Sequence, residues 1–396
     1  MMKHYVFIRK FHKSAHWGGC ENRVCRYFKD ADYSRNRITL MATHDIFTRE
    51  FSKRGIPVEV ASFPLSSENS FIKNFRHMFK LLKVLKPDRV VFVQGSFLDF
   101  RLPEFLAGFF ITKGHVFSLE VLGAREPSLK TSKRYFKCFS GLALWWYKEM
   151  FFLALRGWIS KLTLAVGEEV RDRMVNWYHY PKGRVLTVAT AIDVETFSRG
   201  DEIRHKTRQK YNIPEKDTVI ISTARLSGEK CVDRLINAFD QLWMENSRCW
   251  LLLVGDGPLR PDLEKLASEK VSFDRIKFLG FKENVADYLR MSDLYVLSSD
   301  IEGIATAALE AMASELVCVA TKTPGPSEII QDGVNGYLVE KNRAGVLNGL
   351  TKAVALSDKQ RNEMASNARK FVLEKHTVIP YRNNAVELLG LGDPRK

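Results

Sequence analysis

The chain has 396 residues, of which 45% are hydrophobic and 27% are charged. These globular values exclude a disordered chain, and the length favours two domains, since single domains usually hold ~100–200 residues. The net charge of +15 is one-sided: residues 1–200 hold 33 Lys and Arg against 18 Asp and Glu, and residues 201–396 hold 28 against 28. The basic first half favours nucleic acid, an anionic membrane or an acidic acceptor as partner, and general solubility charge is the alternative.

The N-terminus becomes charged within a few residues, too early for a signal peptide, and no run approaches the ~20 apolar residues of a membrane span. The six cysteines show no paired spacing and predict neither a zinc site nor a disulfide framework: Cys20, Cys25, Cys138, Cys231, Cys249 and Cys318. The sequence therefore predicts a cytoplasmic protein.

Short β-rich runs alternate with less regular sequence in the first half. The predicted strands are Tyr5–Ile8, Ile38–Ala42, Val90–Val93, His115–Leu119, Leu162–Val166 and Val185–Val188. Between the predicted strands His115–Leu119 and Leu162–Val166 lies the aromatic stretch Gly141–Ile159. It is interrupted by three charged residues, Lys148, Glu149 and Arg156. Such a segment is expected to lie on a membrane surface without crossing it.

From Thr218 onward, strands and helical periodicities alternate regularly. The predicted strands are Thr218–Ala224, Trp250–Val254, Ile276–Leu279, Leu294–Leu297, Val317–Ala320 and Gly336–Val339, and a helix is predicted over Ile304–Ala313. This pattern predicts an α/β fold of two doubly wound, Rossmann-like domains facing each other across a cleft. The expected domains are residues 1–197 and 198–377, with a polar linker over Phe197–Lys216.

The strongest local motif is EGIATAALE, which follows a predicted strand and opens a helix. Its carboxylates, Glu302 and Glu310, are spaced to line one side of a pocket. The amides of Gly303 to Ala305 at the expected helix N-terminus suit a phosphate, and carboxylates suit sugar hydroxyls. Taken alone, the motif is equally compatible with a capping acid and an exposed helical Glu.

A cationic pair follows the strand Thr218–Ala224. Arg225 and Lys230, with Gly228 permitting a tight turn between them, form a set that suits a diphosphate. A solvated loop is the alternative for the pair in isolation. Gly18 and Gly19 follow the first strand of the chain and allow a second backbone approach to phosphate. A complete GxGxxG is absent, which argues against a nicotinamide enzyme.

In this order the motifs resemble those of the retaining GT-B glycosyltransferases of family 4. The resemblance covers residues 160–340 well, and includes AIDVETF (191–197) and VGEEVRD (166–172). It implies that Arg225 and Lys230 hold the donor diphosphate, Glu310 the ribose, and Glu302 with the Gly303 and Ile304 backbone the transferred sugar. It also implies that Phe281 lies near the nucleobase, that Gly18 and Gly19 close over the diphosphate, and that residues 378–396 form a helix packing back toward the first domain.

Three positions depart from the family pattern. Ala305 stands where Pro is common, and Cys231 and Ala191 stand where Gly is common. Glu120 stands where the first-domain histidine motif is expected, so Glu120 is the candidate on the acceptor side, with His115 and His16 as weaker alternatives.

The resemblance implies front-face transfer with retention of configuration, from a UDP or GDP sugar to an anionic glycan or lipid-linked acceptor, in lipopolysaccharide or exopolysaccharide synthesis. We expect no metal and no further cofactor, because the cations and amides neutralise the leaving group. Peripheral contact with an anionic membrane at its inner face is expected, and nucleic acid is not. The alternatives are a sugar-nucleotide 2-epimerase of the same architecture and a non-catalytic basic scaffold.

Overall fold

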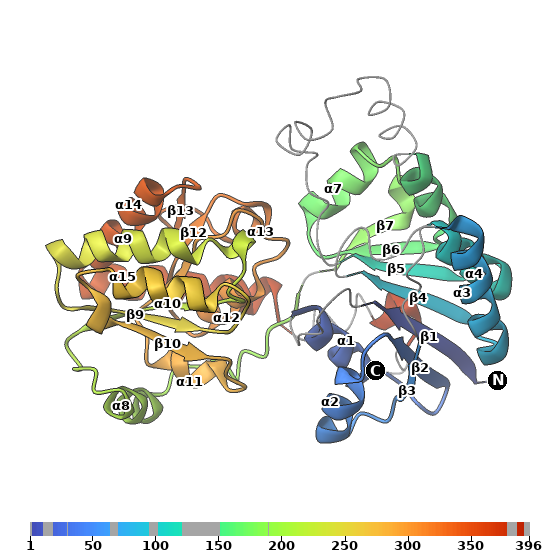
Figure 1. The fold of residues 1–396 in the computed structure, drawn as a ribbon, viewed down its shortest axis with the longest axis horizontal. Coiled ribbons are helices and arrows are strands. Elements are labelled where there is room, and N and C mark those ends of the chain that lie inside the picture. Colours follow the sequence, from blue (N-terminus) through green and yellow to red (C-terminus); the bar gives the residue numbers. More distant parts are fainter. Residues whose placement is uncertain are drawn as a thin grey trace. The chain divides into compact units, whose positions relative to one another are not determined.

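A computed structural model describes residues 2–10, 19–29, 31–63, 70–94, 102–120, 151–188, 190–377 and 386–391 (Figure 1). The chain divides into two compact units. The first comprises Met1–Ala189 with Tyr381–Lys396, and the second Thr190–Pro380. Each unit has a parallel sheet, so the predicted fold class of two Rossmann-like α/β domains is confirmed.

The first unit contains a seven-stranded sheet in the order β3-β2-β1-β4-β5-β6-β7. Its strands are β1 Lys3–Arg9, β2 Asn36–Ala42, β3 Glu59–Ser62, β4 Arg89–Gln94, β5 Val116–Glu120, β6 Leu162–Ala165 and β7 Val185–Thr187. Its helices are α1 Gly19–Lys29, α2 Ile46–Arg54, α3 Phe71–Leu85, α4 Leu102–Thr112, a helix over 151–159, and α7 Glu168–Asn176. The sequence analysis missed only β3, a half-exposed edge strand that pairs with β2 alone and therefore lacks a continuous apolar run.

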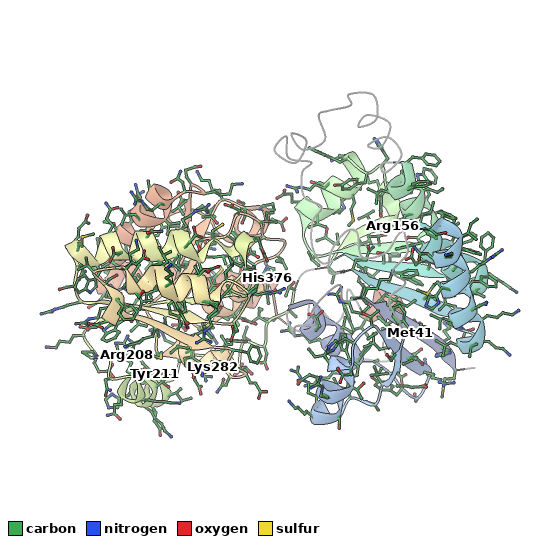
Figure 2. All side chains as sticks on the ribbon, viewed as in Figure 1. Met41, Arg156, Arg208, Tyr211, Lys282 and His376 are labelled. Carbon is green, nitrogen blue, oxygen red and sulfur yellow. The ribbon has the colours of Figure 1, made fainter. Side chains whose placement is uncertain are left out.

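The helix over 151–159 contains one charged residue of the aromatic stretch. Arg156 is 1% exposed and lies within the first unit (Figure 2). Its guanidinium donates to Tyr180 Oη (2.8 Å) and to Gln94 Oε1 (3.1 Å), and it lies over the Phe105 ring. Phe151 and Trp158 of this helix are exposed, and the remainder of the aromatic stretch lies outside the described residues.

Described residues near the C-terminus pack into the first unit. Tyr5 Oη donates to the carbonyl oxygens of Leu389 (3.1 Å) and Gly390 (2.8 Å), and Arg89 donates to Leu389 O at 2.6 Å. Leu389 and Leu391 are fully buried. The helical part of this segment is the short α17, Glu387–Leu389.

The second unit contains a six-stranded sheet in the order β10-β9-β8-β11-β12-β13. Its strands are β8 Thr218–Thr223, β9 Cys249–Val254, β10 Ile276–Gly280, β11 Leu294–Leu297, β12 Val317–Thr321 and β13 Tyr337–Val339. Its helices are α8 Asp201–Lys210, α9 Val232–Glu245, α10 Arg260–Ser268, α11 Val285–Arg290, α12 Thr306–Ala313, α13 Pro324–Ile329, α14 Arg343–Val354 and α15 Asp358–Lys375. Buried apolar side chains on both faces of this sheet form two core clusters, as expected of a parallel sheet covered by helices.

The segment expected to be a linker is instead mostly ordered structure of the second unit. It contains α8, whose Arg208 is fully buried and donates to Asp293 Oδ2 (2.8 Å) and to the carbonyl oxygens of Met291, Pro214, Glu215 and Asp217 (Figure 2). The unit boundary also lies earlier than residue 197. Ile192 is in the core of the second unit, and its amide donates to His376 O.

Candidate functional site

The site in the second unit lies where the order of its sheet reverses. β8 is followed along the chain by β9 and β10 on one side, whereas β11 pairs with β8 on the other side. In open parallel sheets, ligands bind outside the carboxyl ends of the strands at this switch point. The loops that leave β8 and β11 here are 224–231 and 298–305, and they contain the predicted cations and the predicted Glu302.

Lys230 and Glu302 are in direct contact across the switch point. Lys230 Nζ lies 2.6 Å from Glu302 Oε1, and Ser299 Oγ donates to the same oxygen at 2.6 Å. The Glu302 side chain is 8% exposed and that of Lys230 is 21% exposed. The carboxylate is therefore held by two donors, while the Lys230 side chain keeps part of its surface exposed.

A second set of hydrogen bonds holds the two loops in register. Ser298 Oγ donates to the carbonyl oxygens of Lys230 (2.9 Å) and Cys231 (3.0 Å), and the amide of Asp300 donates to Glu229 O at 2.9 Å. Arg234 of α9 donates to Ser298 O (2.9 Å) and to Asp300 Oδ1 (2.8 Å). Burial alone would raise the pKa of Asp300, but Arg234 and the Cys231 thiol outweigh it and lower the pKa. Asp300 thus remains a carboxylate paired to Arg234.

The turn between Arg225 and Lys230 differs from the sequence expectation. Gly228 is not in the left-handed region and has open space where a Cβ would lie, so it is not the residue that permits the turn. Cys231 has that role, with φ 47° and ψ 47°, after the short 3-10 helix Gly228–Lys230. Its thiol is buried, which raises its pKa to about 11, so it is a protonated packing group.

Arg225 lies two residues after the end of β8 and is exposed. Its neighbour Glu229 is half-buried: burial raises the pKa of this carboxyl, but the hydrogen bond from Ser227 (2.7 Å) and the charges of Lys230 and Arg225 lower it overall. Glu229 is thus a third carboxylate near the cationic pair. The sequence analysis did not select it.

Three glycines bring the neighbouring loops into backbone contact. A Cβ on Gly255 would lie 1.9 Å from Ala224 O, one on Gly257 would lie 2.3 Å from Leu226 O, and one on Gly325 would lie 2.1 Å from Gly303 O. The first two support the Arg225 loop from the loop after β9. The third supports the Glu302 loop from α13. These contacts require glycine because any side chain would displace backbone.

Glu310 lies on α12, and Glu302 lies in the loop before it. Burial is the main cause that raises the pKa of Tyr295 in β11, and the charges of Glu302 and Glu310 raise it further. Both carboxylates therefore lie within electrostatic range of one phenol below the site. The helix itself begins at Thr306, two residues later than predicted. Ala305 before it is not helical (φ −77°, ψ 71°), and the Thr306 amide donates to Ile304 O at 2.8 Å in a γ-turn. Gly303 and Ile304 thus belong to the loop and not to the helix.

The remaining predicted residues are located as follows. Phe281 follows β10 and is 60% exposed. The Gly255 amide, in the loop after β9, donates to the carbonyl oxygen of Gly280 at the end of β10 (2.9 Å). Gly19 is the first residue of α1, and Glu120 is the last of β5, paired with Gln94 and Ala165. His115 Nδ1 contacts Thr112 O at 3.0 Å, beside α4. Gly18 and His16 lie outside the described residues.

Sequence reasoning missed the residues that orient the others. Ser299 and Arg234 contact Glu302 and its loop, and Gly325 supports that loop from α13. Ser298 and Ser299 directly follow a buried strand that ends at the switch point. This position in the sequence could have identified them as site residues. Arg234 is separated from Ser298 by 64 residues, and nothing in local spacing indicated that contact.

Two parallel-sheet, Rossmann-like domains make up the GT-B type of fold, and the comparisons with known proteins agree with this fold class. Residues 203–371 match the model of the family described as Glycosyl transferases group 1. Among solved structures, the chain is similar to a glycosyltransferase from Rickettsia africae ESF-5 (TM-score 0.75, 16% identity, 98% of both chains). It is also similar to Anabaena HepE in complex with UDP-glucose (TM-score 0.75, 18% identity, 98% of this chain and 99% of that chain).

Curated relatives match about half of the chain at higher identity. The N-acetyl-alpha-D-glucosaminyl L-malate synthase of Bacillus anthracis is 34% identical over 196 residues, which cover 49% of this chain and 50% of that protein. The lipopolysaccharide 1,2-N-acetylglucosaminetransferase of Salmonella typhimurium is 29% identical over 209 residues, covering 50% and 54%. The chain thus aligns with about half the length of these relatives.

Proposed function

We propose that the protein is a glycosyltransferase that moves a sugar from a nucleotide diphosphate to an acceptor with retention of anomeric configuration, as in family 4. The match to Glycosyl transferases group 1 and the names of the relatives support the reaction class. The UDP-glucose bound to the structurally similar Anabaena protein makes UDP sugars the first donors to test. GDP sugars are the second group of donors to test.

The observation that carries this proposal is the contact of Lys230 with Glu302 at the switch point. In the absence of donor, each charge neutralises the other. A diphosphate that arrives beside Lys230 offers the ammonium a stronger partner, so Glu302 becomes able to accept a hydrogen bond from a sugar hydroxyl. One residue pair thereby recognises the two ends of the scissile bond.

Each remaining candidate has a role in this proposal. Arg225 and Lys230 stabilise the negative charge that develops on the leaving diphosphate. Glu310 accepts hydrogen bonds from the ribose, the backbone of Gly303 and Ile304 positions the sugar, and Phe281 lies against the base. For Gly18 and Gly19 toward the donor, and for Glu120 toward the acceptor, the proposal keeps the roles that the family resemblance implies.

We also propose that the reaction needs no metal, because the two cations supply the charge that a metal would otherwise provide. The test is sugar transfer measured in excess EDTA, with added Mg²⁺ or Mn²⁺ as the comparison. We expect equal rates. A strong dependence on either cation would contradict this part of the proposal.

The proposed acceptor is an anionic glycan or a lipid-linked glycan in lipopolysaccharide or exopolysaccharide synthesis, met at the inner face of a membrane. The excess of positive charge in residues 1–200 supports it, as does the lipopolysaccharide substrate in the name of the Salmonella relative. No helix in the described part of the chain is long and apolar enough to cross a membrane.

The experiment that tests the function separates Lys230 from Glu302. Glu302→Gln removes the charge that neutralises Lys230, so this variant should bind UDP at least as tightly as the wild type, yet transfer sugar at least about 100-fold more slowly. Lys230→Ala should weaken UDP binding by about 10-fold or more, as expected for a lost charge-assisted hydrogen bond. Binding is measured by calorimetry and transfer by mass spectrometry of the acceptor.

Glu340→Ala is the matched control, since Glu340 is an exposed acid paired with Lys322 on the same unit. It should bind UDP and transfer sugar as the wild type does. Weaker UDP binding by Glu302→Gln would contradict the proposal. So would sugar transfer at the wild-type rate after both Glu302 and Glu310 are replaced by Ala. Conversion of the donor without acceptor and without a change of mass would identify a 2-epimerase instead.

A further inference from the structure

A group of large apolar side chains is exposed on the two helices α3 and α4 of the first unit, which pack side by side (Figure 1). Ile72 and Phe110 are each 60% exposed, Phe71 is 44% exposed and Phe109 is 37% exposed. Phe110 meets the ring of Phe75 on α3 edge to face, with ring centroids 6.2 Å apart. Single exposed apolar residues are ordinary, but a contiguous group on neighbouring helices marks an interaction site.

The outer face of α3 is basic. Met78 and Leu82 face the core and are buried, whereas Arg76, Lys80 and Lys83 are exposed. At 100° per residue these three cations point away from the core, next to the side on which Phe75 meets α4. The sequence of α3, FIKNFRHMFKLLKVL, contains no acidic residue.

These three cations make no ion pair with any described residue, whereas the exposed cations of α2, Arg49, Lys53 and Arg54, pair with Asp45 or Glu50 on that same segment. The acid of α4, Glu104, is buried and contacts Lys10, so it does not neutralise the face. The surface formed by Phe71, Ile72, Phe109 and Phe110 with Arg76, Lys80 and Lys83 is hereafter the α3–α4 surface.

We propose that the α3–α4 surface docks the protein on an anionic lipid membrane. This proposal rests on the proposed function, in which the acceptor is met at a membrane. It assigns that membrane contact to the α3–α4 surface. Cations beside protruding apolar side chains are the combination that an anionic bilayer accepts: the cations meet the headgroups and the apolar side chains enter the boundary of the acyl chains.

The test is co-sedimentation of the full chain with vesicles of phosphatidylcholine, with and without phosphatidylglycerol. Wild-type protein should bind the anionic vesicles, bind neutral ones weakly, and dissociate as salt rises. Lys80→Gln with Lys83→Gln should weaken binding about five-fold for each cation removed. Ile72→Ser with Phe110→Ser should weaken binding to the same vesicles without altering its dependence on salt.

The matched controls lie on the second unit. Lys206→Gln with Lys352→Gln removes two exposed cations from α8 and α14, and Met244→Ser with Val271→Ser removes two apolar side chains that are 62% and 71% exposed. Both controls should bind vesicles as the wild type does. Equal loss of binding in controls and test variants, or equal wild-type binding to neutral and anionic vesicles, would overturn the proposal.

Two further readouts keep the outcomes distinct. If the protein is dimeric without lipid and Phe110→Ser makes it monomeric, the surface is a contact between copies and the proposal is wrong. UDP binding should be unchanged in every surface variant, since none touches the loops at the switch point. The experiments can therefore contradict membrane binding while they support the glycosyltransferase function. They can equally support membrane binding while they contradict that function.

Discussion

Cys231 has a conformation that its side chain disfavours, at the junction between the cationic loop and α9. A non-glycine residue in the left-handed region costs about 1–2 kcal/mol, because Cβ approaches the following carbonyl oxygen. The hydrogen bonds of Ser298 to the carbonyls of Lys230 and Cys231 hold the residue there. The loop thus keeps its shape at the expense of local strain.

Replacement of Cys231 tests this strain. Cys231→Gly should be more stable than Cys231→Ala by about 1 kcal/mol, because both variants lose the thiol but only glycine relieves the left-handed conformation. Urea unfolding of the two variants measures the difference. The reverse order, which is normal for a position with ordinary dihedral angles, would show that this residue is not strained in solution.

At the scale of elements, the site depends on loops held against each other by glycine backbones. Gly325→Ala should cost about 1–3 kcal/mol of stability through overpacking against Gly303 O, and should weaken UDP binding although no charged group is removed. Gly228→Ala is the control within the site itself, because its Cβ would meet open space. Thermal unfolding with and without UDP tests both variants, and equal behaviour would mean that the Gly303 loop tolerates the displacement.

The helix α8 is held in place by a buried charge and not by an apolar face. Arg208→Met breaks the buried pair with Asp293 and should lower the stability of the second unit by about 3 kcal/mol. This is the low end for such a change, because Arg204 still pairs with Asp293 at 2.7 Å. Hydrogen exchange followed by mass spectrometry should then show faster exchange over 201–210. Lys206→Met on the exposed side of the same helix should leave that exchange unchanged.

At the scale of the whole molecule, one histidine is buried in each unit among the residues that the structure describes. His4 contacts Leu85 O (3.0 Å) and Thr39 Oγ1 (2.9 Å), and His376 contacts Thr190 O (3.0 Å). Burial is the main cause that lowers the pKa of both imidazoles below the ordinary value of 6.5. Between the lowered and the ordinary pKa, the unfolded chain therefore binds protons that the folded chain does not.

The stability of both units should consequently be full above about pH 6.5 and should decline as the pH falls below it. His376→Gln should reduce this decline in the second unit and His4→Gln in the first, measured as the unfolding midpoint of each unit against pH. The exposed His179 gives the control, His179→Asn, which tolerates the positive φ at that position. An unchanged decline in both test variants would assign the pH dependence to other groups.

The sequence by itself determined the features that depend on local order. Apolar runs alternating with helical periodicity were enough for two parallel sheets, because a buried strand needs a continuous apolar run. Parallel strands end at one edge, so residues that follow strands were expected together, and Lys230 does contact Glu302. The same argument selected Arg225, whereas Glu310 was selected from its helical spacing to Glu302 and Phe281 from the family resemblance.

Only the tertiary structure decided features that rest on contacts between distant residues. The expected linker of low apolar content contains the helix α8, which is held by the contact of Arg208 with Asp293, 85 positions away. Arg156 is buried through contacts with Gln94 and Tyr180, and the left-handed conformation in the cationic loop belongs to Cys231 and not to Gly228. Hydrophobic periodicity records which side of an element is apolar, whereas a buried guanidinium is stabilised by carbonyl and carboxylate oxygens that the rest of the fold supplies.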